Sequence, residues 1–210
     1  MSVTDIEGNS DYCTITLVLQ DNADYCENQA DNIVSVSGRV TLADTRPLVG
    51  TTIVMNSTQP EFPKTLESNQ TGAFQFSGMK KNFDYNLSAQ LNNKVDAGVS
   101  TLDLVLIQRH ILAVQTFNNP YNCIAADIDG NEKINTVDLV NLRKVILGTF
   151  SEFPNGQKSW KIIPSNAQFP NMNAPWPLIE KYNYVNLSQN KSNQNFIGIK
   201  IGDVNNSIVL

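Results

Sequence analysis

The stretch DIDGNEKINTVD, residues 127–138, carries oxygen-bearing side chains at its first, third, fifth, ninth and twelfth positions. These residues are Asp127, Asp129, Asn131, Asn135 and Asp138. A segment with ligand oxygens at nearly alternate positions can wrap a cation from several sides. The spacing therefore predicts a loop that binds a metal ion.

Calcium fits this loop better than the other common metals. Ca²⁺ takes six to eight oxygen ligands, and a twelve-residue loop supplies them from positions 1, 3, 5, 7, 9 and 12. Position 7 contributes the main-chain carbonyl of Lys133, and Asn135 at position 9 reaches the ion directly or through water. Mg²⁺ demands a tighter octahedron, and Zn²⁺ prefers His and Cys ligands, which the loop lacks. The alternative is a polar turn that caps a helix without metal.

Two positions of the loop depart from the usual pattern. Position 6 holds Glu132, where glycine normally permits a sharp turn, so backbone strain is expected there. Position 12 holds Asp138 rather than glutamate. Because no clear helical pattern precedes the loop, these departures favour a loop–helix unit over a helix–loop–helix sensor.

The loop and the helix after it belong to an internal repeat. A shift of 35 residues aligns GVSTLDLVLIQRHIL, residues 98–112, with KINTVDLVNLRKVIL, residues 133–147. Apolar residues recur at helical spacing in both copies, which predicts two amphipathic helices joined by the polar turn TFNNPYNC. The residues expected to face inward are Leu104, Ile107 and Ile111, with Leu112 adjoining, and Leu139, Leu142 and Ile146.

The first loop of the repeat is poorer in ligands than the second. Counting back from Asp103, the ligand positions hold Asn92, Lys94, Asp96, the Gly98 carbonyl and Ser100. Lys94 brings a positive charge to a site for a dication, so either this second Ca²⁺ site is lost or other oxygens complete it. The C-terminal IGDVNN offers Asp203 and Asn205, provided that the chain end lies beside the first helix. Otherwise IGDVNN is an ordinary strand end and turn.

Short alternating segments upstream of the repeat predict β-structure. Residues 33–91 contain the strand-like runs IVSVSGRVTL, TTIVMNS and AFQFSG, with turn signals between them. Regular short strands of this kind favour a small antiparallel sandwich. Gly38 interrupts the first run, which indicates a bulge or a bend. Near the C-terminus, YNYVNLS and NQNFIGIKIGD are typical of a closing β-hairpin.

These patterns predict the α+β fold class and three parts. Residues 1–30, with a strand over CTITLVLQD, are expected to be the tail of a preceding β-domain or a linker. Residues 31–91 are expected to form the small antiparallel β-sandwich. Residues 92–210 are expected to form a calcium-binding pair of loop–helix units followed by the β-hairpin.

Several motifs resemble known families. SGRV, the Pro-Leu-x-Gly-x-x-Ile-x-Met strand and the Thr-Gly-Ala-Phe-x-Phe turn resemble carboxypeptidase regulatory-like (transthyretin-like) domains, which are usually non-catalytic spacers. GVSTLDLVLIQRHIL, IAADIDGN, DLVNLRKVILG, EFPNGQKSWKIIP and NFIGIKIGDVN resemble a dockerin-like module (type I dockerin repeat) of large Bacteroidetes surface proteins. The resemblance implies a Ca²⁺-binding, non-catalytic part of a secreted or cell-surface, adhesin-like protein with type IX secretion signals.

The resemblance also implies candidate partners. Dockerins of cellulosomes bind cohesins through loop positions ten and eleven and along the helix, which correspond here to Thr101, Leu102, Arg109, Thr136, Val137 and Lys144. Leu102 and Val137 depart from the hydroxylated pair of one well-known class. Two hypotheses follow. The module is either a Ca²⁺-stabilised structural and interaction module, with neighbouring domains of its own chain as candidate partners, or a true dockerin that binds a cohesin-like partner to assemble surface enzymes or filaments.

Composition argues against several other classes of protein. A net charge of −5 and a pI near 4.8 are unfavourable for nucleic-acid binding, which requires a basic patch. The sequence has no apolar run of about eighteen residues, so no membrane-spanning helix is expected. The N-terminal residues show no signal-peptide pattern, so the chain is either cytosolic or a piece of a longer secreted protein.

No catalytic constellation stands out in the sequence. His110 is the only histidine, and it lies within a predicted helix. No Ser-His-Asp, metalloprotease or phosphate-loop pattern occurs, so no enzymatic activity is expected. Trp160, Trp176, Tyr182 and Tyr184 are candidates for stacking on carbohydrate, although packing in a core is the favoured interpretation.

The three cysteines leave the redox state open. Cys13 and Cys26 lie in one N-terminal segment, and a disulfide between them requires that this segment fold back as a hairpin. Cys123 would then be a buried thiol. The alternative is three unpaired, packed cysteines.

Overall fold

The computed structural model describes residues 2–12 and 32–210, which fall into two units divided after Asn32. The described part of the first unit is an antiparallel hairpin of β1 (Ser2–Thr4) and β2 (Ser10–Tyr12). The carboxylate of Asp5 accepts hydrogen bonds from the amides of Glu7 and Asn9 and so closes the turn. The strand expected over residues 13–21 and the Cys13–Cys26 disulfide lie outside the described residues.

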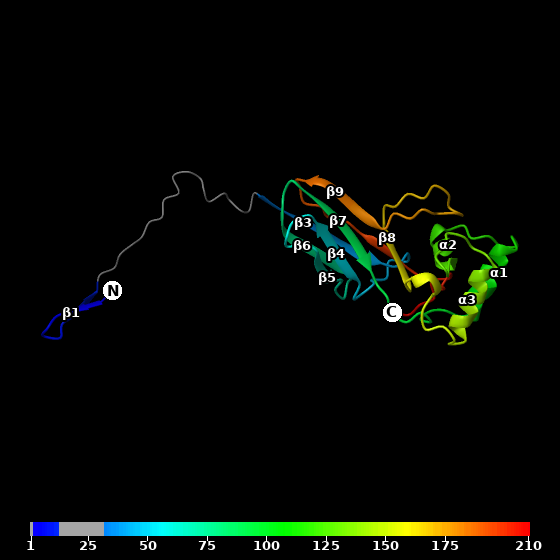
Figure 1. The fold of residues 1–210 in the computed structure, drawn as a ribbon, viewed down its shortest axis with the longest axis horizontal. Helices are drawn as coiled ribbons and strands as arrows, with labels where there is room; N and C mark the ends of the chain where they lie inside the picture. Colours follow the sequence, from blue (N-terminus) through cyan, green and yellow to red (C-terminus); the bar gives the residue numbers. More distant parts are fainter. Residues whose placement is uncertain (1, 13–31) are drawn as a thin grey trace. The chain divides into compact units, whose positions relative to one another are not determined.

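The second unit, Ile33–Leu210, contains two four-stranded sheets (Figure 1). One sheet has the order β6-β3-β10-β8, and the other has the order β5-β4-β7-β9. Their strands are β3 (Ile33–Thr41), β4 (Thr52–Ser57), β5 (Lys64–Glu67), β6 (Ala73–Lys80), β7 (Phe83–Gln90), β8 (Trp160–Pro164), β9 (Lys181–Leu187) and β10 (Phe196–Lys200). The pairing of β3 with β10 is parallel, so the sandwich is mixed rather than purely antiparallel as expected.

One apolar core lies between the two sheets. Alternate residues of each strand point to the same face, and those on the inner faces are buried. Val36 of β3 and Phe76 of β6 represent one sheet, and Ile53 of β4 and Leu87 of β7 represent the other. The two sheets therefore pack face to face as a sandwich.

The expected C-terminal hairpin does not form, because β9 and β10 belong to different sheets. β9 pairs with β7, and β10 pairs with β3 and β8. Tyr184 and Leu187 of β9 and Phe196 of β10 enter the sandwich core from opposite sheets. Strands from both sides of residue 91 thus complete each sheet, and residues 33–210 form one compact unit.

β8 and β10 are buried on both faces. Trp160 and Ile162 of β8 lie in the sandwich core, whereas the next residue, Ile163, lies in a second core beneath the helices. In β10, Phe196 faces the sandwich core and Ile199 faces the helical core. This double burial explains why WKIIP and FIGIK are apolar at consecutive positions instead of alternating.

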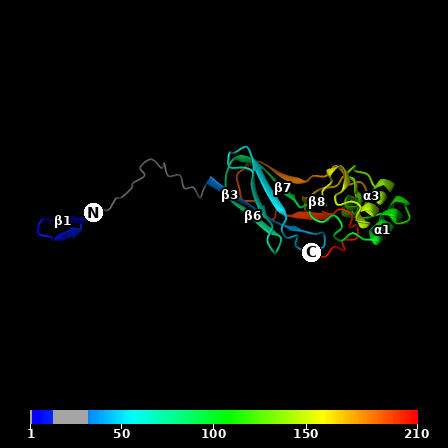
Figure 2. The same ribbon diagram turned by 60° about the horizontal axis from the view of Figure 1, so that its bottom comes forward.

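Three helices gather at one end of the sheets, as the two views in Figures 1 and 2 show. They are α1 (Thr101–Ile111), α2 (Pro120–Ala126) and α3 (Thr136–Ile146). α1 and α3 are the predicted repeat: each begins with a capping box, Ser100 with Asp103 and Asn135 with Asp138. None of the helices in the described ranges is long and apolar enough to cross a membrane.

The inward faces of the two repeat helices are largely as predicted. Ile107 and Leu142 are fully buried, and the remaining inward residues are partly buried in the same core. Leu112, expected to adjoin the inward face, is instead 62% exposed, because it follows the end of α1 and is no longer held against the core.

α2 was not predicted, since TFNNPYNC was interpreted as a turn. Its start nevertheless follows known helix signals: the Asn119 side chain caps the amide of Tyr121, and Pro120 stands at the first helical position. α2 leads directly into the second loop, so a short helix does precede that loop.

Gly38 marks a close approach between two backbones rather than the expected bulge. The irregularity in β3 lies between Val34 and Val36, and Gly38 pairs regularly with Phe74. A Cβ atom added at Gly38 would lie 2.2 Å from the carbonyl oxygen of Gln194. Only glycine lets the segment before β10 come this close to β3.

Replacement of this glycine should therefore weaken the junction between β3 and the C-terminal segment. We expect Gly38→Ala to lower the free energy of unfolding by about 1–3 kcal/mol, because backbone atoms must move to admit the methyl group. The neighbouring Ser37→Ala, at a half-buried position, should change it by less than about 0.5 kcal/mol. Urea unfolding measures both, and equal midpoints for the two variants would contradict the assignment.

Candidate metal centre

The carboxylates of Asp127, Asp129 and Asp138 come together in the second loop. One oxygen from each lies within 4.8 Å of the others, and the three residues are 3, 8 and 0% exposed. Asp127 directly follows α2, and Asp138 lies in the first turn of α3. The loop between the two helices therefore concentrates three carboxylates at a buried place in the fold.

Backbone amides of the loop hold two of these carboxylates in place. Asp138 accepts hydrogen bonds from the amides of Ile128 through Oδ1 (2.8 Å) and Asn135 through Oδ2 (2.8 Å). Asp127 accepts from the amides of Asn131 through Oδ1 (3.0 Å) and Glu132 through Oδ2 (3.0 Å). Each aspartate thus organises the backbone around it, which fixes the shape of the loop.

The remaining predicted ligands lie in the same loop. The Asn131 side chain donates to Asp129 Oδ2 (3.0 Å), and its own Oδ1 accepts from the Lys133 amide (2.9 Å). Asn135 Oδ1 accepts from the Val137 amide (2.8 Å) and so caps α3. The structure therefore brings the carboxylates of Asp127, Asp129 and Asp138 together and links Asn131, Lys133 and Asn135 to the same loop by hydrogen bonds.

The strain expected at position 6 is present. Glu132 has φ 65°, in the left-handed region, and Gly130 at position 4 has φ 69°. A non-glycine residue in this region costs about 1–2 kcal/mol. The hydrogen bonds that the amides of Asn131 and Glu132 donate to the Asp127 carboxylate offset this cost.

A second segment, not foreseen from the sequence, covers the back of the loop. The side chains of Asn155 and Gln157, at the short 3₁₀ turn η2 (Pro154–Gly156), donate to the carbonyls of Asp129 (3.0 Å) and Asp127 (3.3 Å). Their amide side chains resemble many others in this Asn-rich chain, so no local pattern singles them out. Both bonds go to main-chain carbonyls of the loop rather than to its carboxylates.

Burial disfavours the charged forms of Asp127 and Asp138. Burial raises the pKa of Asp127 to about 6, and the neighbouring charges of Asp138 and Asp129 contribute to this shift. Burial also raises the pKa of Asp138. A divalent cation would relieve both the desolvation and the repulsion. A donor set made only of oxygens fits Ca²⁺, with Asp127, Asp129 and Asp138 supplying the charge.

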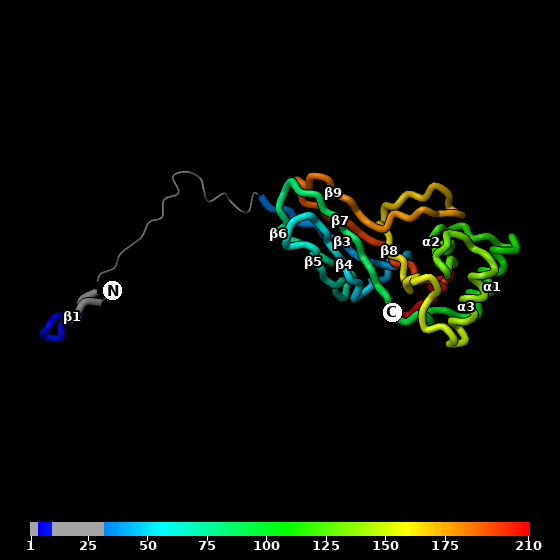
Figure 3. Tube along the Cα trace, in the orientation of Figure 1, coloured from blue at the N-terminus to red at the C-terminus, as the bar shows by residue number. Residues whose placement is uncertain are grey.

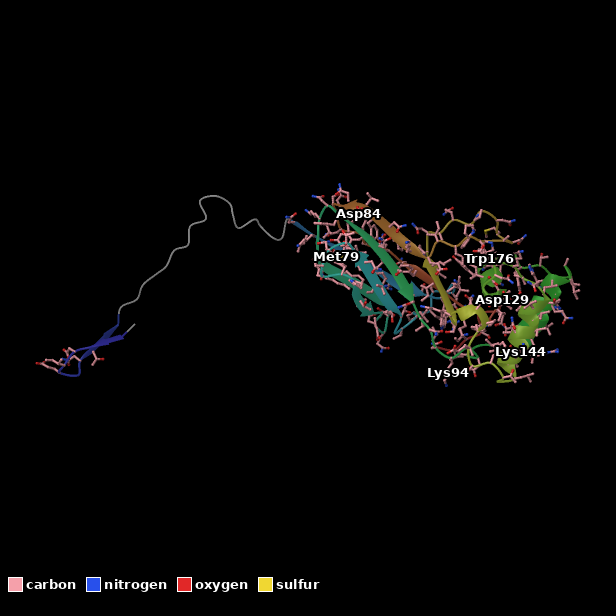
Figure 4. The ribbon with its side chains drawn as sticks, in the orientation of Figure 1. Met79, Asp84, Lys94, Asp129, Lys144 and Trp176 are labelled. Carbon is pink, nitrogen blue, oxygen red and sulfur yellow. The ribbon has the colours of Figure 1, made fainter. Side chains whose placement is uncertain are left out.

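The predicted residues of the first loop separate into two groups. Asn92 lies away from α1, because its Oδ1 accepts from the Ser159 amide (3.0 Å) next to β8. Lys94 and Asp96 are exposed, and Figure 4 shows Lys94 on a different part of the unit from Asp129. By contrast, Gly98, Ser100 and Asp103 stay together at the start of α1.

The C-terminal segment lies beside this second group. In Figure 3 the last residues, in red, run next to the green segment that leads into α1. The Val204 amide donates to Asp103 Oδ1 (3.0 Å), which brings the adjacent Asp203 and Asn205 to the start of the helix. The condition for a contribution from IGDVNN, a chain end near the first helix, is therefore met.

The other candidate residues have structural roles. His110 Nδ1 accepts a hydrogen bond from the Phe117 amide (2.9 Å), and the two rings stack at 4.5 Å. Trp160 and Tyr184 are buried in the sandwich core, and Tyr182 packs against that core while Trp176 packs against the helical one. Cys123 is a buried free thiol whose pKa is raised by burial to about 11.

Comparison with known families agrees with this geometry. Residues 92–147 match the dockerin type I domain. The matched residues include both loops and both repeat helices. Dockerin domains bind Ca²⁺ and attach to cohesin-type protein partners.

Similarity of the whole chain to other known proteins is slight. No curated protein matches the chain. Among solved structures, the dioxygenase domain of a dioxygenase–carbohydrate-binding protein fusion from the cellulolytic bacterium Streptomyces sp. SirexAA-E aligns with 18% identity and a TM-score of 0.25. That alignment covers 30% of this chain and about half, 51%, of the other.

The buried carboxylates predict opposite pH trends without and with calcium. In metal-free buffer the stability of the second unit should fall as the pH rises from about 4 to above 6. The reason is that the folded pKa of Asp127, about 6, lies above its value of 3.8 in the unfolded chain, so the folded state holds the proton more tightly. With Ca²⁺, which favours the ionised carboxylates, the gain in melting temperature should grow over the same range. Melting curves across this range test both trends, and parallel curves with and without Ca²⁺ would contradict the prediction.

Proposed function

We propose that residues 33–210 form a non-catalytic, Ca²⁺-stabilised protein-docking module of a larger secreted or cell-surface protein. The buried carboxylates of Asp127, Asp129 and Asp138 carry this proposal, because three such groups within 4.8 Å call for a bound cation. The dockerin match over residues 92–147 supports it. All the ligands predicted from the sequence of the second loop offer oxygen atoms, which Ca²⁺ prefers.

A docking surface follows from the same repeat. α1, α3 and the residue that follows each helix expose apolar side chains at equivalent positions, between 44 and 69% exposed: Leu102 with Val137, Val105 with Val140, and Leu112 with Leu147. The basic Arg109 and Lys144 are exposed on the same two helices, and Figure 4 labels Lys144 on α3. Paired apolar positions flanked by cations form a face that suits a protein partner, and we assign a cohesin-type domain to it.

The sandwich has a supporting role in this proposal. Its inner faces are filled by side chains of both sheets, and the aromatic candidates for carbohydrate binding are packed in or against the cores. A transthyretin-like sandwich would act as a spacer that holds the helices at one end. An extracellular setting, adhesin-like and reached by type IX secretion, suits a Ca²⁺ site of modest affinity, because Ca²⁺ is abundant there.

Calcium should raise the stability of the second unit. At a hundredfold excess over its Kd, the ion adds about 2.7 kcal/mol to the free energy of unfolding. For a domain of this size, that corresponds to about 5–10 °C in melting temperature. Asp127→Asn should lose most of this gain, whereas the exposed Glu152→Gln, a matched change from acid to amide, should keep it. The idea fails if calorimetric melting temperatures are the same in Ca²⁺ and in chelator.

Charge placed on the helix faces should abolish docking without unfolding the module. We expect Val105→Glu combined with Val140→Glu to weaken binding to immobilised cohesin modules in Ca²⁺ by at least about tenfold, because both side chains are exposed centres of the apolar face. Val185→Glu on β9, 82% exposed, is the matched control and should bind like the wild type. Surface plasmon resonance with a panel of cohesins provides the measurement. Equal affinities for all three proteins, or no binding by the wild type, would count against this partner.

A further inference from the structure

Asp103 has the same backbone environment as Asp138, although its own loop does not surround it. Asp103 accepts hydrogen bonds from the amides of Val204 through Oδ1 (3.0 Å) and Ser100 through Oδ2 (2.8 Å). In the second loop, Asp138 receives the equivalent pair from residues of one continuous segment. Here one donor lies just before the helix, and the other lies about a hundred residues away in the sequence.

The C-terminal segment repeats the first half of the second loop. Asp203 accepts from the amides of Ser207 through Oδ1 (2.9 Å) and Ile208 through Oδ2 (2.8 Å), which lie four and five residues further along. Asp127 accepts from the amides four and five residues after it in the same way. Asp203 therefore takes the place of position 1.

Positions 3 to 5 follow in register. Asn205 Oδ1 accepts from the Ser207 amide (3.0 Å), as Asp129 Oδ1 accepts from the amide of Asn131 (3.2 Å). Asn206, at position 4, has φ 55°, and Gly130 at the same position of the second loop also has a positive φ. Asn205 and Ser207 thus stand at the ligand positions 3 and 5.

The two halves meet at Gly98. Ser207 Oγ donates to the Gly98 carbonyl oxygen (3.1 Å), which is the main-chain ligand of position 7. A Cβ atom on Gly98 would lie 2.8 Å from Asp203 Oδ2 and 2.7 Å from Ile208 Cβ. The absence of a side chain lets the C-terminal segment dock here, in place of the peptide link that joins positions 6 and 7 in the second loop.

The assembled donors are all oxygens. Asp103 and Asp203 supply carboxylates and are 0 and 4% exposed, Asn205 supplies an amide oxygen, and Ser207 and Ser100 supply hydroxyls. The Gly98 carbonyl completes six positions. This set fits Ca²⁺, the ion that dockerin domains bind.

A buried cation lies near this cluster. Lys200 is 3% exposed, and its Nζ donates to the carbonyls of Val95 (2.8 Å) and Ile201 (3.1 Å). The charge of Asp203 acts on this ammonium and opposes the fall in the Lys200 pKa that burial causes. The hydrogen bonds of Lys200 nevertheless go to the backbone, so the Asp203 carboxylate binds the amides of Ser207 and Ile208 instead of the ammonium.

We propose a second Ca²⁺ site that is split between residues 203–207 and residues 98–103, with Asp203, Asn205, Ser207, the Gly98 carbonyl, Ser100 and Asp103 as ligands. The contiguous residues Asn92, Lys94 and Asp96 take no part. The proposal rests on the proposed function, since it extends the same chemistry to the first repeat. Two carboxylates instead of three make this the weaker site. Ion binding here ties the C-terminal segment to α1.

Isothermal titration calorimetry of the whole chain with Ca²⁺ separates the two sites. We expect two ions for the wild type, the weaker of which disappears in Asp203→Asn, while Asp127→Asn removes the tighter one. Asp96→Asn, the same chemical change in the contiguous first loop, should still bind two ions. Asn205→Ala, at an exposed position that leaves the buried carboxylates intact, should weaken the second site on the order of tenfold.

The outcomes distinguish this proposal from the proposed function. One ion in the wild type, lost in Asp127→Asn, would overturn the split site and leave the proposed function standing. Two ions in both the wild type and Asp203→Asn, or a loss in Asp96→Asn, would also overturn the split site. No ion in the wild type would overturn both. As a second measurement, Ca²⁺ should slow proteolytic removal of residues after 203 in the wild type and in Asp127→Asn, but not in Asp203→Asn.

Discussion

The second unit depends on two strands that are buried on both faces. β8 and β10 are hydrogen-bonded to each other and contribute side chains from one face to the sandwich core and from the other face to the helical core. The two cores therefore share this strand pair. The strands before residue 91 bury side chains against one face of this pair, and the three helices after it bury side chains against the other. The packing of Trp160, Ile163, Phe196 and Ile199 therefore couples the sandwich to the helices. The loops before α1 and α3 are held against this shared strand pair.

On this support, the two repeat units reach the same arrangement through different chain connections. In the second repeat a continuous loop folds around Asp138. In the first repeat the segment after β10 approaches Asp103 from a distant part of the sequence. Buried carboxylates need compensation wherever they occur, and amide donors alone provide only part of it. A shared environment around position 12, rather than a continuous loop, is what the two units have in common.

The convergence of Asp127, Asp129 and Asp138 was predictable, because the three residues lie within twelve positions and their spacing is visible in the sequence. The helix repeat was also predictable, since Ile107 and Leu142 lie at the expected places in the 35-residue period. The pairing of β9 with β7 and of β10 with β3 was not, because strand partners distant in sequence leave no local pattern. For the same reason Ser207 was missed: its role depends on the contact with Gly98, which only the tertiary fold creates. Gly38 was visible in the sequence, but the predicted bulge was wrong, because the glycine instead admits the close approach of the Gln194 carbonyl.

The parallel pairing of β3 and β10 has a mechanical consequence. β3 is the strand by which the chain enters the second unit, and β10 is the last strand before the C-terminal segment. Beyond their paired residues, the two segments are joined by hydrogen bonds between Ser37 and both Lys191 and Gln194. Tension applied between residue 33 and residue 203 would pull these neighbouring segments lengthwise past each other. In such a shear geometry the hydrogen bonds between the two segments resist the force together. They would break one after another only if the force acted across the strands.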